Sequence, residues 1–303
     1  MEFVMIIYTL TLNPAFDLHY TIENFKPYSE NYVDESLTQS AGKGINISRA
    51  LRSEGVDNTA FVIVGGNDFD SYSKNLDIDC KYFVTEGDVR KNITVHTKGM
   101  PETRISLDDF VVKKEIFNDF KKALCHVCDE DTIVTFTGRL PKGIDKQDAK
   151  DMLVDIKKTG AKIVCDCNSF TLDDLAEIKP WLIKPNETEI KELYDGDIMT
   201  AGEKLHNSGI DNVMISLGSE GVVCFCNQGI FKVIPPKIEV VSTIGAGDST
   251  IAGFVTAYTK GWNVEDCVKY GVATGTAACL EEGTNPPDKV NIEKIFDEIR
   301  ERT

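Results

Sequence analysis

Residues 132–166 read TIVTFTGRLPKGIDKQDAKDMLVDIKKTGAKIVCD, a sequence that predicts a strand, a helix and a second strand. The two ends, 132–136 and 161–166, are apolar runs without polar alternation. Such runs are typical of strands in a parallel sheet that is covered on both faces. Between them, residues 145–158 have helical periodicity. The stretch therefore predicts one strand–helix–strand unit of an α/β fold.

The same alternation continues along the chain in both directions. Further strands are predicted at 5–12, 60–64, 181–184, 213–217 and 221–226. Further helices are predicted at 44–53, 114–127, 187–193, 201–207, 248–259, 264–280 and 291–301. We therefore predict an α/β fold with a doubly wound, mostly parallel sheet and helices on both faces.

Two stretches do not follow this alternation. Residues 16–40 are polar with scattered Tyr and Phe, and residues 90–106 alternate polar with apolar side chains. We expect both to form antiparallel strands of a small β-sheet lid; the alternative is two long surface loops, which are uncommon unless they are functional. The prediction is one α/β domain over 1–303, with a lid formed by about 16–40 and 88–107.

The charge balance limits the classes of partner. The chain has 33 Lys and Arg against 49 Asp and Glu, a formal net charge of −16. Such a surface repels phosphate backbones, which argues against a general nucleic-acid or anionic-membrane binder. An anionic substrate must then be held by a few local basic groups. The apolar fraction of 42% excludes a disordered or collagen-like chain.

The sequence predicts a cytoplasmic protein. The first apolar run, MEFVMIIYTLTLNP, is short and lacks a basic start and a cleavage site, so we interpret it as a core strand. About 18 consecutive apolar residues, the signal of a membrane span, occur nowhere. The nine cysteines suit buried, reduced thiols. Cys125 and Cys128 have metal or redox spacing, but no second such pair lies nearby.

A glycine-rich turn precedes a predicted helix in STIGAGDSTIAGF, residues 242–254. The backbone N–H groups of Gly245, Ala246 and Gly247, together with the helix dipole, predict an anion hole. Asp248 follows directly, and a carboxylate there suits a general base that takes the proton of a substrate hydroxyl. The alternative is that Asp248 only caps the helix.

A second glycine-rich turn lies in SAGKGINISRA, residues 40–50. Its backbone donors, the Lys43 ammonium and the Asn46 amide suit a polyhydroxylated ligand. Asp17 follows the first strand, where a carboxylate can accept hydrogen bonds from sugar hydroxyls; the alternative is an ordinary turn residue.

Other nucleotide-binding motifs are not matched. Lys43 does not complete a P-loop, and Thr250 occupies the position of the third Rossmann glycine. The protein-kinase motifs H-R-D and D-F-G do not occur.

Five motifs occur in the order found in the ribokinase-like carbohydrate kinases. They are LNPA with Asp17, AGKGIN at 41–46, IKPNETE at 183–189, ISLGSEG at 215–221 and STIGAGDSTIAGF at 242–254. The chain thus resembles the phosphofructokinase B group, and within it the subgroup of 1-phosphofructokinases and tagatose-6-phosphate kinases. The similarity spans residues from about 6 to 285.

The resemblance implies roles for particular residues. Asp248 would be the catalytic base, with Gly245, Ala246 and Gly247 as the anion hole. The sugar would be held by Asp17, Gly42, Lys43, Gly44, Asn46 and Asn92. Arg90 would reach the phosphate that the substrate already carries, since its planar fork bonds phosphate bidentately; the alternative is a solvated strand charge.

The resemblance also implies ATP and Mg²⁺ as cofactors and, as in some relatives, a monovalent cation. The nucleotide would contact Lys184, Asn186, Ser216, Gly218, Glu220 and Gly221. Asn186 and Glu189 match an N-x-x-E motif that holds Mg²⁺ through water, in keeping with the preference of Mg²⁺ for oxygen ligands and retained waters. The alternative is that Asn186 caps a helix and Glu189 completes a capping box.

Three departures from the subgroup bear on the substrate. TGRLP at 137–141 stands where the subgroup usually has SGSLP, so Arg139 either strengthens phosphate binding or crowds the pocket. Ala41 replaces the first glycine of GGKG, which is a mild change. Residues 67–79 are shorter than the usual helix bordering the substrate.

The resemblance implies a kinase that phosphorylates fructose 1-phosphate to fructose 1,6-bisphosphate. Tagatose-6-phosphate kinase and fructose-6-phosphate kinase activity are the alternatives. A catalytically inactive sugar-phosphate-binding regulator is a hypothesis from another class, and the presence of Asp248, Asn186 and Glu189 argues against it. We expect a homodimer paired through the lid, because apolar Ile93, Val95 and Ile105 would otherwise face solvent.

Overall fold

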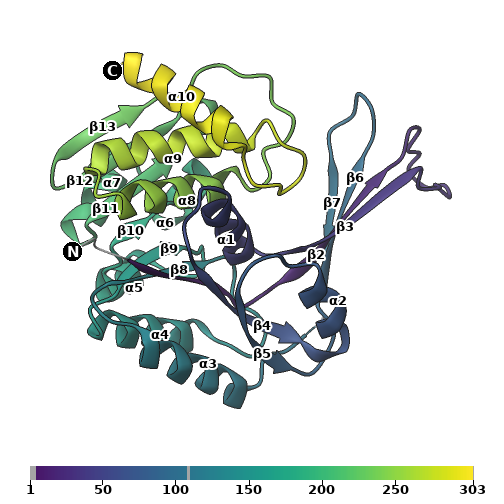
Figure 1. Cartoon of the computed structure of the whole chain (residues 1–303), viewed down its shortest axis with the longest axis horizontal. Coiled ribbons are helices and arrows are strands. Elements are labelled where there is room, and N and C mark those ends of the chain that lie inside the picture. Colours follow the sequence, from purple (N-terminus) through teal and green to yellow (C-terminus); the bar gives the residue numbers. More distant parts are fainter. Residues whose placement is uncertain (1–4, 108–109, 303) are drawn as a thin grey trace.

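The computed structural model describes residues 5–107 and 110–302, which form a large sheet between two layers of helices and a small separate sheet (Figure 1). The strands are β1 (Ile6–Thr11), β2 (Ala15–Thr21), β3 (Glu35–Ala41), β4 (Thr59–Gly65), β5 (Cys80–Thr85), β6 (Arg90–His96), β7 (Thr103–Ser106), β8 (Thr132–Thr137), β9 (Lys162–Asp166), β10 (Leu182–Ile183), β11 (Asn212–Ser216), β12 (Val222–Cys226) and β13 (Gly229–Val233). The helices are α1 (Lys43–Ser53), α2 (Phe69–Lys74), α3 (Lys114–Val127), α4 (Lys146–Lys158), α5 (Leu172–Ile178), α6 (Glu187–Leu193), α7 (Ile198–Asn207), α8 (Ala246–Thr259), α9 (Val264–Ala278) and α10 (Lys289–Arg302), with 3-10 turns η1 (Gly66–Asp68) and η2 (Gly218–Glu220).

The large sheet is mostly parallel. Within the described ranges it has nine strands in the order β13-β12-β11-β10-β9-β8-β1-β4-β5. All neighbours from β11 to β5 pair in parallel, and only β12 and β13 are added antiparallel. This arrangement confirms the predicted fold class.

Helices cover both faces of this sheet. In Figure 1, α3, α4 and α5 lie on one side, and α1, α8, α9 and α10 lie on the other. Successive strand residues therefore enter different cores: Ile133 packs with the second group of helices and Val134 with the first. Burial on both faces explains why the central strands are continuous apolar runs.

The small sheet has the order β3-β2-β6-β7. β2 pairs antiparallel with β3, and β6 pairs antiparallel with β7, as expected of two hairpins. The central pair, β2 with β6, is parallel, so the expectation of antiparallel strands alone is wrong at this position. Because β2 begins four residues after β1 ends, the small sheet projects directly from the carboxyl edge of the large one (Figure 1).

The elements that sequence analysis missed are at the borders of the fold. β5 and β13 are the two edge strands of the large sheet, and their partly exposed residues lack the continuous apolar signal. The short helices α2 and α5 were also missed, and α2 spans part of the shortened 67–79 segment.

The nine cysteines are free thiols. In the part of the chain that is described, no helix has the length and apolar character needed to cross a bilayer.

Candidate active site

The predicted site residues gather where parallel strands of the large sheet end. Asp166 is the last residue of β9, Lys184 directly follows β10, and Ser216 ends β11. β1 ends at Thr11, next to the start of α1. Ligands of open α/β sheets bind at this carboxyl edge, so the location agrees with a functional site.

The glycine-rich turn places Asp248 in the first turn of α8. Gly245 is the N-cap, in the left-handed region at φ 78°, and no side chain caps this helix. The alternative in which Asp248 caps the helix is therefore wrong. The Asp248 carboxylate is buried, at 5% exposure, and its Oδ2 accepts a hydrogen bond from Asn46 Nδ2 at 2.9 Å. The turn of α8 and the start of α1 are thus joined at one carboxylate.

The surroundings of Asp248 set its acidity. Burial raises the pKa of the carboxyl to about 6, against the opposing effects of Lys43, Asn46 and Lys184, while nearby Asp166 raises it further. A carboxyl with a pKa near neutrality is suited to accept and release a proton at physiological pH. This is the titration behaviour expected of a general base.

Two lysines and a buried aspartate lie beside this carboxylate. Lys43 Nζ is 3.0 Å from Asp166 Oδ2, and Lys184 Nζ is 3.8 Å from Asp166 Oδ1. Burial opposes the charge of Asp166, but the two ammonium groups outweigh it and hold the pKa of the carboxyl below its usual value. Burial alone would lower the pKa of Lys43. The Asp166 carboxylate outweighs burial and raises the pKa of this lysine. Lys43 and Asp166 therefore stay charged near neutral pH.

Lys184 connects this cluster to the glycine-rich turn. A Cβ atom added at Gly247 would lie 3.0 Å from Lys184 Nζ, so the ammonium lies directly against the turn. Positive charge and backbone donors thus occupy the same place, which is the arrangement that an anionic group in transfer requires.

The glycines of the second turn are required by close packing. A Cβ at Gly44 would lie 2.4 Å from the carbonyl oxygen of Leu10, and one at Gly42 would lie 2.6 Å from Thr11 Cγ2. α1 can start against the end of β1 only because both side chains are absent. That close approach brings Asn46 to Asp248. The two glycines therefore help to position the site, and this role does not depend on any contact with a ligand.

The three predicted sugar-binding residues of the small sheet form one hydrogen-bonded group. Asp17 on β2 and Asn92 on β6 are register partners, and Asn92 Nδ2 donates to Asp17 Oδ1 at 2.7 Å. Arg90 Nη1 donates to Asn92 Oδ1 at 3.1 Å, and Arg90 Nε donates to the Asn13 carbonyl at 3.3 Å. The group adjoins the end of β1, where the small sheet leaves the large one.

Asn186 and Glu189 form the capping box that was the alternative interpretation. Asn186 caps α6 by accepting from the N–H groups of Thr188 and Glu189, each at 2.9 Å, and Glu189 Oε2 accepts from Asn186 N at 2.8 Å. For Glu189 a capping role and a role toward magnesium are compatible, because the cap uses Oε2 and the carboxylate has a second oxygen. The metal role stays a prediction.

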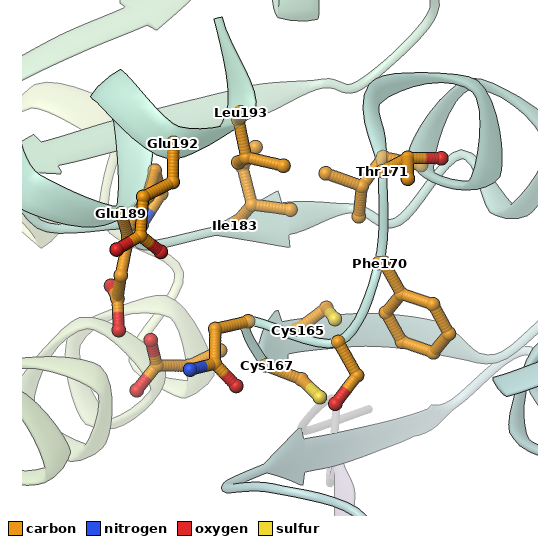
Figure 2. Close-up of a pocket in the computed structure, with 13 residues that line it drawn as sticks. Cys165, Cys167, Phe170, Thr171, Ile183, Glu189, Glu192 and Leu193 are labelled. Atoms are coloured by element: carbon orange, nitrogen blue, oxygen red, sulfur yellow. The ribbon is translucent and has the colours of Figure 1, made fainter. Parts of the chain in front are cut away.

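A pocket of about 230 Å³ adjoins this cluster (Figure 2). Asp166 and Glu189 both line it, and Figure 2 shows Glu189 and Glu192 across the pocket from Cys165 and Cys167. Asp166 lies outside the motifs that predict the other site residues. The available signal was a carboxylate that ends a predicted buried strand, at the edge where ligands bind.

The remaining predicted residues lie near the same edge. Ser216 forms a bridge with Asn186, and Gly221 has φ 87° in the tight turn before β12, where a Cβ would meet the Val233 carbonyl at 1.9 Å. Glu220 is exposed and pairs with Lys232 at 3.4 Å, and Gly218 begins the η2 turn. The nucleotide role of these residues stays a prediction.

Arg139 follows a turn that is placed by the cluster itself. Gly138 N donates to the Asp166 carbonyl at 3.0 Å, and a Cβ at Gly138 would lie 3.8 Å from Lys43 Cδ. Arg139 directly follows this glycine and is exposed, and its substrate role stays a prediction.

Comparison with known proteins agrees with this geometry. The model of the pfkB family carbohydrate kinases matches residues 11–291. The chain is 33% identical to a 1-phosphofructokinase of Borreliella burgdorferi over 97% of both chains, and 28% identical to a tagatose-6-phosphate kinase of Staphylococcus epidermidis over 97% of this chain and 98% of the relative. The phosphofructokinase-2 of Escherichia coli, solved in complex with potassium, superposes with a TM-score of 0.90 at 24% identity, over 98% of this chain and 99% of that one.

These similarities extend over nearly the whole chain, and the family model matches the span that contains every predicted site residue. The chain belongs to the pfkB family of carbohydrate kinases.

Proposed function

We propose that the protein transfers the terminal phosphoryl group of ATP to a hydroxyl of a phosphorylated ketose, with fructose 1-phosphate as the preferred acceptor. One observation carries this proposal. A buried carboxylate with a pKa of about 6 lies at the first turn of a helix whose glycine-rich start is backed by an ammonium group. Acceptance of a hydroxyl proton and stabilisation of a transferring anion require these two features together.

The residues then have separate tasks. Asp248 takes the proton of the acceptor hydroxyl as its oxygen attacks the terminal phosphorus, and the bond from that phosphorus to the bridging oxygen breaks to release ADP. The N–H groups of residues 245–247 and the Lys184 ammonium stabilise negative charge on the group in transfer. Asn46 orients the Asp248 carboxylate through the 2.9 Å hydrogen bond.

The acidic groups of the pocket fit Mg²⁺. Mg²⁺ keeps several waters and is usually held by one or two carboxylates together with substrate phosphates. Glu189 lines the pocket and has a carboxylate oxygen beyond the one that accepts from Asn186 N, so Glu189 together with Asn186 would hold Mg²⁺ through water. The metal would neutralise phosphate charge when bound, and the ATP phosphates would lie toward Lys184, Asn186 and the 216–221 segment.

The relatives support a phosphorylated ketose as acceptor. The names 1-phosphofructokinase and tagatose-6-phosphate kinase both occur among proteins that match almost the whole chain. Lys43, Arg90 and Arg139 supply the local positive charge that a sugar phosphate needs on a chain of net charge −16. Tagatose 6-phosphate is the second candidate because one of these relatives is named a tagatose-6-phosphate kinase.

The small sheet would act as a lid over the sugar, and the protein would pair through it. Ile105 on β7 is 50% exposed and Leu37 on β3 is 49% exposed, so apolar surface is open on this sheet. Val95, by contrast, is buried within one chain and cannot contribute.

A cytoplasmic location is part of the proposal, because nine unpaired thiols suit a reducing compartment.

A coupled assay of ADP release over a panel of sugar phosphates tests the proposal. The panel contains fructose 1-phosphate, fructose 6-phosphate and tagatose 6-phosphate, with unphosphorylated fructose as control. We expect the largest kcat/KM with fructose 1-phosphate and little turnover of fructose. Binding of a sugar phosphate by calorimetry without turnover of any acceptor would overturn the kinase proposal in favour of a binding protein.

A further inference from the structure

A second cluster of polar side chains lies on the small sheet, beyond the sugar-binding group. Residues of β2 alternate between its two faces, so Asp17, His19 and Thr21 lie on one face. His19 is therefore on the same face as Asp17, one step further from the large sheet. His19 Nδ1 is 3.0 Å from His96 Nε2, and His96 Nδ1 is 3.3 Å from Glu102 Oε1.

The contacts of these side chains favour one arrangement of protons. Glu102 Oε1 lies 3.3 Å from His96 Nδ1, and a carboxylate favours an N–H at that nitrogen, which leaves Nε2 of a neutral His96 ring to accept from His19. His19 then donates from Nδ1, which leaves its Nε2 as an acceptor. Adding one proton to either ring places an N–H at His19 Nε2, because the shared proton can shift between the rings.

The free nitrogen of His19 faces the body of the protein. His19 is only 9% exposed, and its Nε2 has no hydrogen-bond partner among the described residues. A Cβ added at Gly283 would lie 3.6 Å from this nitrogen, so the ring packs against the loop between α9 and α10. The neighbouring Gln39 Nε2 donates to Asn285 Oδ1 at 3.2 Å, which makes a second contact with the same loop. In Figure 1 this loop runs toward the small sheet.

The loop in turn reaches the catalytic turn. A Cβ added at Gly245 would lie 3.8 Å from Thr284 Cγ2, so Thr284 packs against the glycine that starts α8. One short loop thus touches the small sheet through Gly283 and Asn285 and the anion hole through Thr284. The position of the small sheet and that of the glycine-rich turn are linked by direct packing.

We propose that His19 is a positioning residue, whose neutral ring seats the small sheet against Gly283 and whose protonation loosens that contact. The seated sheet holds Asp17 and Asn92 over the site, so protonation weakens capture of the sugar phosphate. This consequence for the sugar rests on the proposed function, whereas the seating itself does not.

Burial of His19, rather than the carboxylates around it, gives this direction. Burial lowers the pKa of His19 from its ordinary 6.5, and His96 and Arg104 lower it further, against the opposing effects of Asp17 and Glu102. The groups facing it are completed by Glu35 on β3 and Glu282 on the loop, which line a cavity of about 370 Å³ with both histidines. The seated form, in which His19 packs against Gly283, binds the proton less well than the open form, in which this contact is broken. Seating is therefore favoured above the open-form pKa and weakens as the pH falls through it.

Hydrogen–deuterium exchange on the substrate-free protein tests the seating. Exchange of amides in β2 and in residues 281–285, corrected for intrinsic rates, is compared between about pH 7.5 and about pH 5.5. We expect severalfold faster exchange at the lower pH, up to about tenfold for each pKa unit by which seating lowers the pKa. Unchanged or slower exchange at the lower pH would overturn the proposal, and this comparison needs no variant.

The variant His19→Asn keeps a donor to His96 but cannot titrate. Its exchange is expected to lose the pH dependence, whereas His126→Asn, at an exposed histidine of α3, is expected to behave as wild type. The chain has four histidines, so a proton NMR titration resolves them, and the variant assigns His19. Titration of His19 at or above 6.5, or retained pH dependence of exchange in His19→Asn, would contradict the proposal.

Kinetics supply the functional readout. The KM for the sugar phosphate is expected to rise on acidification in wild type and to stay flatter in His19→Asn, while the kcat profile, set by Asp248, is the same in both. Equal KM profiles would contradict the link to sugar capture. If no acceptor of the panel is turned over, the proposed function fails, and the exchange experiment still decides the seating.

Discussion

Replacing Asp166 by asparagine tests whether the buried cluster of Lys43, Asp166 and Lys184 stabilises the fold. The Asp166 side chain is 4% exposed and lies between Lys43 and Lys184, of which Lys184 is 6% exposed. The substitution keeps the shape and removes the charge that compensates a buried ammonium. Breaking a buried pair in this way destabilises by about 3–5 kcal/mol, and we expect the lower part of this range because Lys43, at 43% exposure, can be solvated.

Asp155→Asn is a matched control for this variant. Asp155 also has two lysine partners, Lys121 at 2.5 Å and Lys158 at 2.7 Å, but its side chain is 39% exposed. Exposed pairs contribute at most about 1 kcal/mol, so this variant should lose little stability.

Urea unfolding at neutral pH measures both free energies of unfolding. The pKa of Asp166 is lowered in the folded protein, so its stabilisation is present at neutral pH and disappears as the pH falls below the ordinary carboxyl range. The difference between wild type and Asp166→Asn should therefore shrink in acid. Equal losses in the Asp166 and Asp155 variants would refute the reasoning from burial.

Three further predictions follow from the same contacts. Because the pKa of Asp248 is raised to about 6 by burial and the base must be ionised, kcat/KM should fall about tenfold per pH unit below that value, and a pH–rate profile that stays flat to pH 5 would contradict this. Gly44→Ala should destabilise the fold by about 1–3 kcal/mol and lower turnover, because its Cβ would meet the Leu10 carbonyl at 2.4 Å; wild-type stability in urea would show that α1 does not need this approach. Ile105→Asp should convert a dimer to a monomer in light scattering, and a monomeric wild type at micromolar concentration would remove the proposed pairing.

The parts of the fold that sequence predicted are those with a strong local signal. Strands such as β8 and β9 are buried on both faces, so their apolar runs stand out. Edge strands β5 and β13 carry a weaker pattern because one side is partly exposed. The parallel pairing of β2 with β6 joins residues about 75 positions apart, and neither strand alone indicates its partner.

The site residues that the sequence predicts are those in motifs of consecutive residues. Asp248 and its three preceding residues form one turn, and the structure confirms that this turn opens a helix. Asp166 was missed because its importance comes from Lys43 and Lys184, which reach it from other strands and turns. The hydrogen bond between His19 and His96 spans 77 positions and was not foreseeable for the same reason.

The central claim is that Asp248 removes the proton of the acceptor hydroxyl, and Asp248→Asn measures it most directly. With ATP, Mg²⁺ and the preferred sugar phosphate, kcat should fall by about 10²–10⁴-fold. Calorimetry should still detect binding of the sugar phosphate, which shows that the variant is folded. A variant that binds the sugar phosphate and retains kcat within about tenfold of wild type would contradict the account.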